Sequence, residues 1–290
     1  MNRKEQEFHF IHAYASEYPV KMLVGLTTVS RAGYYKWRNR HGERVQEQKD
    51  QEILPYFLKL FDRHKATLGR RRMKLHLEID FGIHINEKRV ARILDRFGLR
   101  CQIRQKRFRR HTHLHDKVPN VLERQFKAVK PGRKFCVDIT YIPVKKGRMR
   151  WVYACVIIDL FNREVVASVT STNQDINLVF QAVHCLKEKG FEKGAILHSD
   201  QGFQFTNPRY RTYLKELGIT QSMSRRGNCW DNACIENFFS HLKSEMPMFS
   251  PLNTVQEIHD AVGSYTSYYN KDRGQTKLKS TPEQYRLNVA

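Results

Sequence analysis

From Phe135 onward, strand-like and helix-like stretches follow one another in an order that constrains the fold more than any other feature of this sequence. The strand-like stretches are apolar and bounded by turn residues, and the helical ones repeat their apolar residues every three to four positions. The expected strands are 135–144, 151–160, 164–171, 195–199 and 219–224, and the expected helices are 176–189, 208–217, about 232–246 and about 255–270. Three antiparallel strands followed by alternating helices and strands predict a mixed five-stranded sheet with helices on both faces.

This order of elements is that of an α/β, RNase H-like fold. A more polar and strongly basic helical region precedes it in the chain. We therefore expect an N-terminal helical segment over 1–50, a small basic all-α helix-turn-helix domain over 51–115, a linker over 116–134, and the RNase H-like domain with its C-terminal helices over 135–290.

The helix-turn-helix is predicted from residues 68–100. One helix is expected over Arg71–Ile79, ending at Asp80-Phe81-Gly82, and Asn86 is expected to cap a second helix. In the second helix an apolar stripe is formed by Val90, Ile93, Leu94 and Phe97, and the side chains expected on the opposite side are Lys88, Arg89, Arg92 and Arg96. A helix that is buried on one face and cationic on the other suits DNA docking, and the basic run containing Arg104 and Arg107 extends that charge. The alternative is an ordinary solvated helix.

Two flanking segments carry weaker signals. Residues 18–40 resemble short helices broken near Thr27-Thr28, with Ser30 as the N-cap of the second. In the linker, three histidines alternate at His111, His113 and His115. They could suggest a metal, but no cysteine pair accompanies them at zinc spacing, so we interpret them as solvated loop residues.

The charge of the whole chain points to a polyanionic partner. Fifty-one Lys and Arg residues against 29 Asp and Glu give a formal net charge of +22. Nucleic acid is the usual partner of such a surplus, and an anionic membrane surface or ribosomal RNA are the rivals. The N-terminus lacks a signal-peptide pattern, and no apolar run approaches the roughly 20 residues of a membrane span. We expect a cytoplasmic protein whose six cysteines, none in a CxxC pair, are reduced.

Three acidic residues stand where metal-dependent phosphodiester chemistry needs them. Asp138 lies within an apolar strand, Asp200 ends a buried strand just before Gly202, and Glu236 lies on a helix that Asp231 or Asn232 is expected to cap. Two Mg²⁺ ions about 3.5–4 Å apart can stabilise both oxygens of an in-line displacement, and Mg²⁺ prefers carboxylate ligands.

A basic residue accompanies them. Lys243 follows Glu236 by seven residues, so both align on one flank of the helix, where the ammonium could reach a DNA phosphate. Taken singly, Asp138 could be a strand-edge charge, Asp200 a turn residue and Glu236 a solvated helical residue. Asp159, on the second strand, is a rival carboxylate that we interpret as a turn partner.

Several motifs resemble one family. They are Asp138-Ile-Thr-Tyr-Ile142, His198-Ser-Asp-Gln-Gly202, Ser224-Arg-Arg-Gly-Asn-Cys-Trp-Asp-Asn-Ala233 with Glu236-Asn-Phe-Phe239, and the terminal Tyr269-Asn270, Arg273, Leu278 and Thr281-Pro-Glu283. Together with Gly69-Arg-Arg71 upstream, they resemble the DDE transposases of the IS-three type of bacterial insertion sequence, in particular the second-frame (OrfB) product with its retroviral-integrase-like core. The resemblance covers nearly the whole chain. Two departures are Phe135, where Trp is usual, and Gln275, where His is frequent.

The resemblance implies a function and its partners. Asp138, Asp200 and Glu236 would bind two Mg²⁺ ions, for which Mn²⁺ can substitute, and Lys243 would contact DNA near the element end. The enzyme would cleave at the terminal inverted repeats and join the freed 3′-hydroxyl to target DNA. It would assemble as a homo-oligomer on DNA at the bacterial nucleoid, with the upstream-frame (OrfA) protein or fused to it. The alternatives are an RNase H-like nuclease without strand transfer and a catalytically silent DNA-binding regulator.

Overall fold

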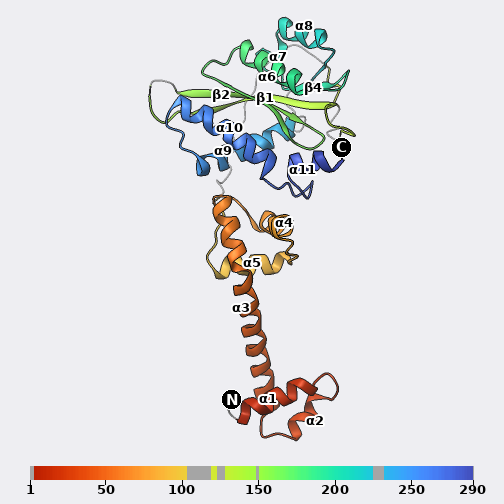
Figure 1. Cartoon of the computed structure of the whole chain (residues 1–290), viewed down its shortest axis with the longest axis vertical. Coiled ribbons are helices and arrows are strands. Elements are labelled where there is room, and N and C mark those ends of the chain that lie inside the picture. Colours follow the sequence, from red (N-terminus) through yellow and green to blue (C-terminus); the bar gives the residue numbers. More distant parts are fainter. Residues whose placement is uncertain (1–2, 103–118, 123–127, 148–149, 225–231, 290) are drawn as a thin grey trace.

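A computed structural model describes residues 3–102, 119–122, 128–147, 150–224 and 232–289, with the side chains of 41–45 excepted. One long helix, α3, joins a small N-terminal helical unit to a second helical unit, and the α/β domain lies beyond it (Figure 1). The helices are α1 (Arg3–Tyr14), α2 (Val20–Gly25), α3 (Arg31–Arg63), α4 (Arg70–Phe81), α5 (Glu87–Arg96), α6 (Ile176–Lys189), α7 (Phe203–Thr206), α8 (Pro208–Glu216), α9 (Ala233–Phe249), α10 (Val255–Lys271) and α11 (Pro282–Val289). The strands are β1 (Lys134–Pro143), β2 (Trp151–Asp159), β3 (Val165–Ser171), β4 (Ile196–Ser199) and β5 (Thr220–Met223).

The five strands form one mixed sheet in the order β3-β2-β1-β4-β5. β1 pairs antiparallel with β2 and parallel with β4, β2 pairs antiparallel with β3, and β4 pairs parallel with β5. The α/β, RNase H-like fold with flanking helices is therefore confirmed. Among the described helices, none is both long enough and apolar enough to cross a membrane.

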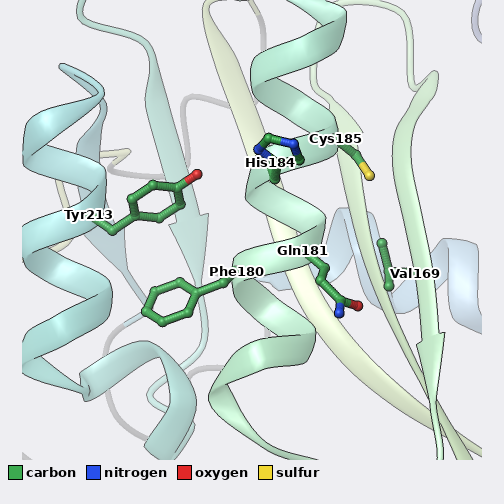
Figure 2. Close-up of a pocket in the computed structure, with 6 residues that line it drawn as sticks. All are labelled: Val169, Phe180, Gln181, His184, Cys185 and Tyr213. Atoms are coloured by element: carbon green, nitrogen blue, oxygen red, sulfur yellow. The ribbon is translucent and has the colours of Figure 1, made fainter.

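One face of the sheet is covered by α6 and α8. The cluster of buried side chains on this face includes Phe135 and Val137 of β1 together with Leu178, Val179 and Leu214 from the two helices. The outer surface of this layer has a hollow between α6, α8 and β3, lined by Val169, Phe180, Gln181, His184, Cys185 and Tyr213 (Figure 2).

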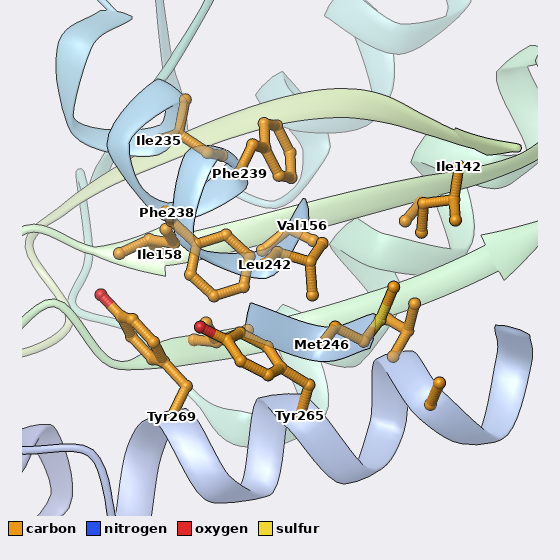
Figure 3. Close-up of a cluster of buried hydrophobic side chains, with 14 of the residues drawn as sticks. Ile142, Val156, Ile158, Ile235, Phe238, Phe239, Leu242, Met246, Tyr265 and Tyr269 are labelled. Atoms are coloured by element: carbon orange, nitrogen blue, oxygen red, sulfur yellow. The ribbon is translucent and has the colours of Figure 1, made fainter. Parts of the chain in front are cut away.

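The opposite face is covered by α9 and α10. Phe238, Leu242 and Met246 of α9 and Tyr265 and Tyr269 of α10 pack there against alternate residues of β1 and β2 (Figure 3). They belong to the stripe predicted for the helix at 232–246, whose further members Ile235 and Phe239 are buried in the same cluster. Because strand side chains alternate between faces, and Cys136 and Ile142 belong to this cluster, Asp138 also faces α9.

The N-terminal helical region contains one long helix where the sequence suggested a boundary between two domains. α3 runs for 33 residues, so the expected domain boundary between residues 50 and 51 falls inside one helix. Ser30 caps α3 as predicted, because its side chain accepts a hydrogen bond from the amide of Gly33. The five cysteines that the structure describes are not joined in disulfides.

The end of α3, α4 and α5 form the predicted helix-turn-helix unit. Their shared core includes Leu60, Met73, Leu77, Val90 and Ile93, all of which are buried. α4 ends where Gly82 adopts a left-handed conformation (φ 65°), which glycine tolerates at a helix C-terminus. The side chain of Asn86 then caps α5 by accepting a hydrogen bond from the amide of Lys88.

A buried ion cluster joins this helical unit to the α/β domain. Glu245 of α9 accepts hydrogen bonds from Nε and Nη2 of Arg273 at 2.8 and 2.9 Å, and Nη1 of Arg72, on α4, lies 3.1 Å from the same carboxylate. The Glu245 and Arg273 side chains are 3% and 2% exposed. Burial alone would raise the pKa of Glu245, but the hydrogen bonds and charges of Arg273 and Arg72 lower it to about 2.

Two neighbouring histidines, His64 and His76, extend this contact. His64 follows α3 and shares a 2.8 Å hydrogen bond with the Tyr268 hydroxyl, while Nε2 of His76 accepts the amide hydrogen of Gly274 at 3.1 Å. The rings lie 4.2 Å apart. With Asp80 they present potential metal ligands within 4.8 Å, but Nδ1 of His76 already bonds Asp80, so both nitrogens of that ring are in use. Burial, reinforced by the charges of His76 and Arg63, lowers the pKa of His64 to about 3.

Acidification from about pH 7.5 to about pH 5.5 should weaken the fold at this contact. Unfolded His64 binds a proton near pH 6.5, whereas folded His64 binds one only near pH 3, so the unfolded state holds more protons in this window. The free energy of unfolding should then fall by up to about 1.4 kcal/mol per pH unit below pH 6.5, measurable by urea denaturation. His64→Gln should reduce this slope, and His84→Gln, at an exposed site, should not. Equal slopes in both variants would contradict the assignment.

Candidate active site

Asp138 is the innermost of the predicted carboxylates. It lies in the middle of β1 on the face covered by α9. Its Oδ1 accepts a hydrogen bond from the Ile139 amide at 2.7 Å, and its Oδ2 accepts one from Nδ2 of Asn232 at 3.2 Å. The carboxylate is therefore fixed by one hydrogen bond from its own strand and by another from the residue that precedes α9.

Asp200 follows directly after β4, the parallel neighbour of β1. The strand register pairs Cys136 with His198, so two residues further along both strands Asp138 and Asp200 reach the same level. Neighbouring strands lie about 4.8 Å apart, which brings the two aspartates side by side at the carboxyl end of β4. The amide of Gly202 donates to Oδ1 of Asp200 at 2.9 Å and fixes its orientation.

Glu236 comes from the first turn of α9 and is exposed. It follows Asn232, the N-cap residue, by four positions, and residues four apart lie on the same side of a helix. Because Asn232 donates to Asp138, Glu236 lies on the flank of α9 that faces the aspartates. The sequence predicted Asn232 only as a possible cap, yet its side chain makes no capping bond and supports Asp138 instead.

The charges of Asp200 and Glu236 both act on Asp138, so the three carboxylates lie near one another. The pKa of Asp138 is raised well above its ordinary value, first by burial, then by the charge of Asp200, and also by that of Glu236. Burial likewise raises the pKa of Asp200, and the Gly202 amide opposes this shift. The site therefore concentrates acidic oxygens whose mutual repulsion a cation would relieve.

Lys243 provides the positive charge of this region. Its Nζ lies 4.5 Å from the centre of the Tyr141 ring, and Trp151 packs edge-on against the same ring. Its charge acts on Asp138 and opposes the rise in the pKa of that carboxyl group. A cation held against an aromatic face next to acidic oxygens can contact an anionic substrate that the oxygens alone would repel.

Two neighbouring residues have structural roles. His198 is buried, and its Nδ1 and Nε2 lie 2.9 and 3.3 Å from the hydroxyls of Ser222 and Ser224, which ties the end of β4 to β5. Asp159 is a turn partner, as the sequence suggested, because its two oxygens accept the amide hydrogens of Gly132 and Phe161 at 2.7 and 2.8 Å.

The hollow of Figure 2 is separate from the carboxylates. Val169, Phe180 and Tyr213, which line it, pack with the side chains on the α6 face of the sheet, whereas Asp138 points to the α9 face. The sheet lies between them, so the hollow takes no part in the chemistry of the carboxylates.

The comparisons with known proteins agree with this geometry. Two models of an integrase core domain match residues 128–229 and 236–289, and a model of an HTH-like domain matches 48–107. The InsK protein of insertion sequence element IS150 from Escherichia coli is 36% identical over 273 residues, covering 93% of this chain and 94% of that protein. The transposase InsF of IS3A from the same organism is 32% identical, covering 82% and 83%.

This chain belongs to the IS-three-type insertion-sequence transposases. A solved simian T-cell lymphotropic virus intasome structure is also similar to it, with 14% identity, a TM-score of 0.48, and coverage of 79% of this chain and 73% of that one. The match to the InsK protein spans nearly the whole transposase, so the helical units and the α/β domain belong to one family architecture.

The predicted DNA-contacting arginines of the transposase are placed differently from expectation. Arg89 and Arg92 do not project away from the protein, because both donate to the carboxylate of Asp50 on α3, at distances of 2.9 to 3.1 Å. Arg96 lies 3.8 Å from the same carboxylate. Lys88 is exposed as predicted, while Arg104 and Arg107, like the linker histidines, lie outside the described residues.

Asp50 explains this difference. It is completely buried, and although burial acts to raise its pKa, hydrogen bonds from Arg92 and Arg89 hold the pKa below its ordinary value. A buried carboxylate needs cationic partners, and the nearest ones are these arginines. The pairing joins residues about forty positions apart, in segments that the sequence assigned to different domains.

Replacing Arg89 and Arg92 together with Ala should destabilise the helical unit, because Asp50 would remain buried without its hydrogen-bonding partners and with only Arg96, 3.8 Å away, as a cationic neighbour. We expect a loss of about 2–3 kcal/mol, below the 3–5 kcal/mol of a fully buried pair since both guanidinium groups are partly exposed. Urea denaturation followed by far-ultraviolet circular dichroism measures this loss. Lys88→Ala is the matched control and should change stability by less than about 0.5 kcal/mol. Equal stability of the two variants would refute the pairing.

Proposed function

We propose that this chain cleaves DNA at the ends of an insertion sequence and joins the freed 3′-hydroxyl to target DNA, with Asp138, Asp200 and Glu236 as its metal-binding residues. The observation that carries the proposal is the convergence of three carboxylates from β1, β4 and α9, of which Asp200 and Glu236 both act on the pKa of Asp138. Carboxylates this close together repel one another, and a divalent cation bound between them would remove that repulsion.

The donor set suits a hard divalent cation. Carboxylate oxygens are the ligands that Mg²⁺ prefers, and the amide oxygen of Asn232 is a further candidate. That oxygen is buried and has no hydrogen-bond partner among the described residues. We expect two Mg²⁺ ions, with Mn²⁺ as a substitute. When bound, the metal would stabilise the attacking and leaving oxygens of an in-line phosphoryl displacement.

The other residues would hold the substrate and the carboxylates in position. Lys243, seated against Tyr141, would contact a backbone phosphate next to the scissile bond. Asn232 would keep the Asp138 carboxylate oriented, and His198 would fix the strand end that carries Asp200. Water would attack the terminal phosphodiester, and the released 3′-hydroxyl would then attack another phosphodiester, with no covalent intermediate on the protein.

The assembly is part of the same proposal. The enzyme would act on terminal inverted repeats and target DNA at the bacterial nucleoid, as a homo-oligomer, and with the upstream-frame (OrfA) protein or fused to it. A nuclease without strand transfer, or a silent DNA-binding regulator, would be the alternatives. Intact carboxylates disfavour the regulator, and the long basic helical region, which a dedicated hydrolase does not need, disfavours the nuclease.

Asp138→Asn, Asp200→Asn and Glu236→Gln should each abolish cleavage and joining of labelled element ends in Mg²⁺, because each removes a metal ligand. DNA binding in the absence of Mg²⁺ should remain. Asp260→Asn, at an exposed carboxylate of α10, is the matched control and should keep full activity. Substantial joining by any of the three variants would remove that residue from the site, and cleavage by the unchanged protein without joining would favour the nuclease.

Lys243→Ala should weaken binding to element ends and flatten its salt dependence. Each lost phosphate contact reduces the slope of log binding constant against log salt by about 0.9. Filter binding or fluorescence anisotropy at several salt concentrations measures the slope. Lys187→Ala removes an exposed lysine of α6, on the opposite face of the sheet, and should leave the slope unchanged. The same slope in both variants would take Lys243 off the DNA surface.

A further inference from the structure

We propose that the N-terminal unit, residues 3–40, is a second DNA-binding element that docks on duplex DNA through the first turns of α3. It consists of α1, α2 and the start of α3 and precedes the helix-turn-helix unit described above. The inference goes beyond the proposed function, because it assigns a ligand to a part of the chain that the chemistry of cleavage and joining does not use.

The unit has the order of elements of a helix-turn-helix. α2 ends at Gly25, a short turn follows, and Ser30 caps α3. Its small core is formed by one residue from each part, namely Ile11 of α1, Leu23 of α2, Val29 of the turn and Tyr34 of α3. In DNA-binding proteins of this type the second helix enters the major groove with its N-terminal residues, and the first helix crosses the backbone.

Contacts from α1 hold the turn and α3 in place. The carboxylate of Glu7 accepts hydrogen bonds from the amide and hydroxyl of Thr28 at 3.0 and 2.7 Å. Phe8 stacks on Trp37 of α3 with ring centres 5.5 Å apart. Contacts with both α1 and α2 therefore fix the orientation of the first turns of α3. A helix that contacts DNA needs such a fixed orientation.

The first turns of α3 carry exposed cations on two flanks, with Arg31 and Arg38 on one flank and Lys36 and Arg40 on the other. Four exposed basic residues, with no acidic residue between positions 31 and 40, are Arg31, Lys36, Arg38 and Arg40. No carboxylate among the described residues forms a salt bridge with any of them, and the guanidinium groups of Arg31 and Arg38 lie over the Tyr35 ring at 5.8 and 4.7 Å. The contrast with α5 is informative, because Arg89 and Arg92 there already pair with Asp50.

A phosphate polyanion fits this surface better than a protein does. Exposed apolar side chains also occur on the unit, at Phe10, Tyr14, Tyr18, Met22 and Leu26, and they would be the contact for a second copy of the chain. They belong to α1, α2 and the connecting segments, whereas Arg31, Lys36, Arg38 and Arg40 belong to α3. The exposed Lys21 adds charge on α2, the helix expected to cross the DNA backbone.

The length of α3 sets the spacing of the two helical units. Its 33 residues span about 50 Å at 1.5 Å per residue, and its far end packs in the helix-turn-helix unit through Phe57 and Leu60 (Figure 1). About 50 Å corresponds to roughly 15 base pairs of duplex. Contact by both units would therefore extend the protected DNA by up to about one and a half helical turns.

The test is footprinting and salt-dependent binding of the full chain on a duplex carrying the element end. The triple variant Lys36→Gln, Arg38→Gln, Arg40→Gln should shorten the footprint by roughly 10–15 base pairs. It should also reduce the salt slope by about 2–3, since each lost phosphate contact contributes about 0.9. The control triple variant Lys187→Gln, Lys193→Gln, Lys215→Gln removes the same charge from the α/β domain and should leave the footprint length unchanged.

Two outcomes would overturn the proposal. One is an equal footprint and an equal salt slope in the two triple variants, with far-ultraviolet circular dichroism showing both folded. The other is an unchanged footprint with a smaller assembly in sedimentation, which would assign the unit to a second copy of the chain. Asp138→Asn should retain the full footprint, so failure of this proposal is distinguishable from failure of the proposed chemistry.

Discussion

The parallel pairing of β1 with β4 is the constraint on which the rest of the structure depends. It places Asp138 and Asp200 at one level on adjacent strands, and the buried apolar residues around them hold that register. The cost is a raised pKa for both carboxyl groups, because burial and mutual repulsion disfavour their charged forms. The fold tolerates this repulsion because many apolar contacts hold the strands in place. On this face of the sheet α9 and α10 supply those contacts.

Much of the fold could be predicted because its signals are local. The apolar period of α6 and the glycine after it predicted the helix bounds as observed, and Asn86 and Gly82 marked helix ends through backbone chemistry alone. α1 lies within the helical segment expected over 1–50, but its bounds were not predicted, since Ile11 is its only buried residue. The bounds of α11 were not predicted either, because its eight residues, which begin with Pro282, carry little apolar pattern.

The candidate site was predictable in its carboxylates and less so in their surroundings. Asp138, Asp200 and Glu236 lie in recognisable motifs, whereas the support from Asn232 depends on where α9 begins relative to β1. The pairing of Arg89 with Asp50 was beyond sequence reasoning, because an amphipathic pattern shows which side of a helix is polar but not which distant charge meets it. The same holds for Arg72 and Arg273, whose common partner is Glu245.

α9 has a mechanical consequence for this molecule. It carries Glu236 in its first turn and Glu245 nine positions later, about 14 Å along the same helix. Glu245 is paired with Arg72 of the helix-turn-helix unit. A rotation of that unit relative to the sheet would therefore have to move α9 or break this buried ion pair. A movement of the helix-turn-helix unit would therefore reach the acidic residues through α9, and the contacts of His64 with Tyr268 and of His76 with Gly274 would resist the same movement.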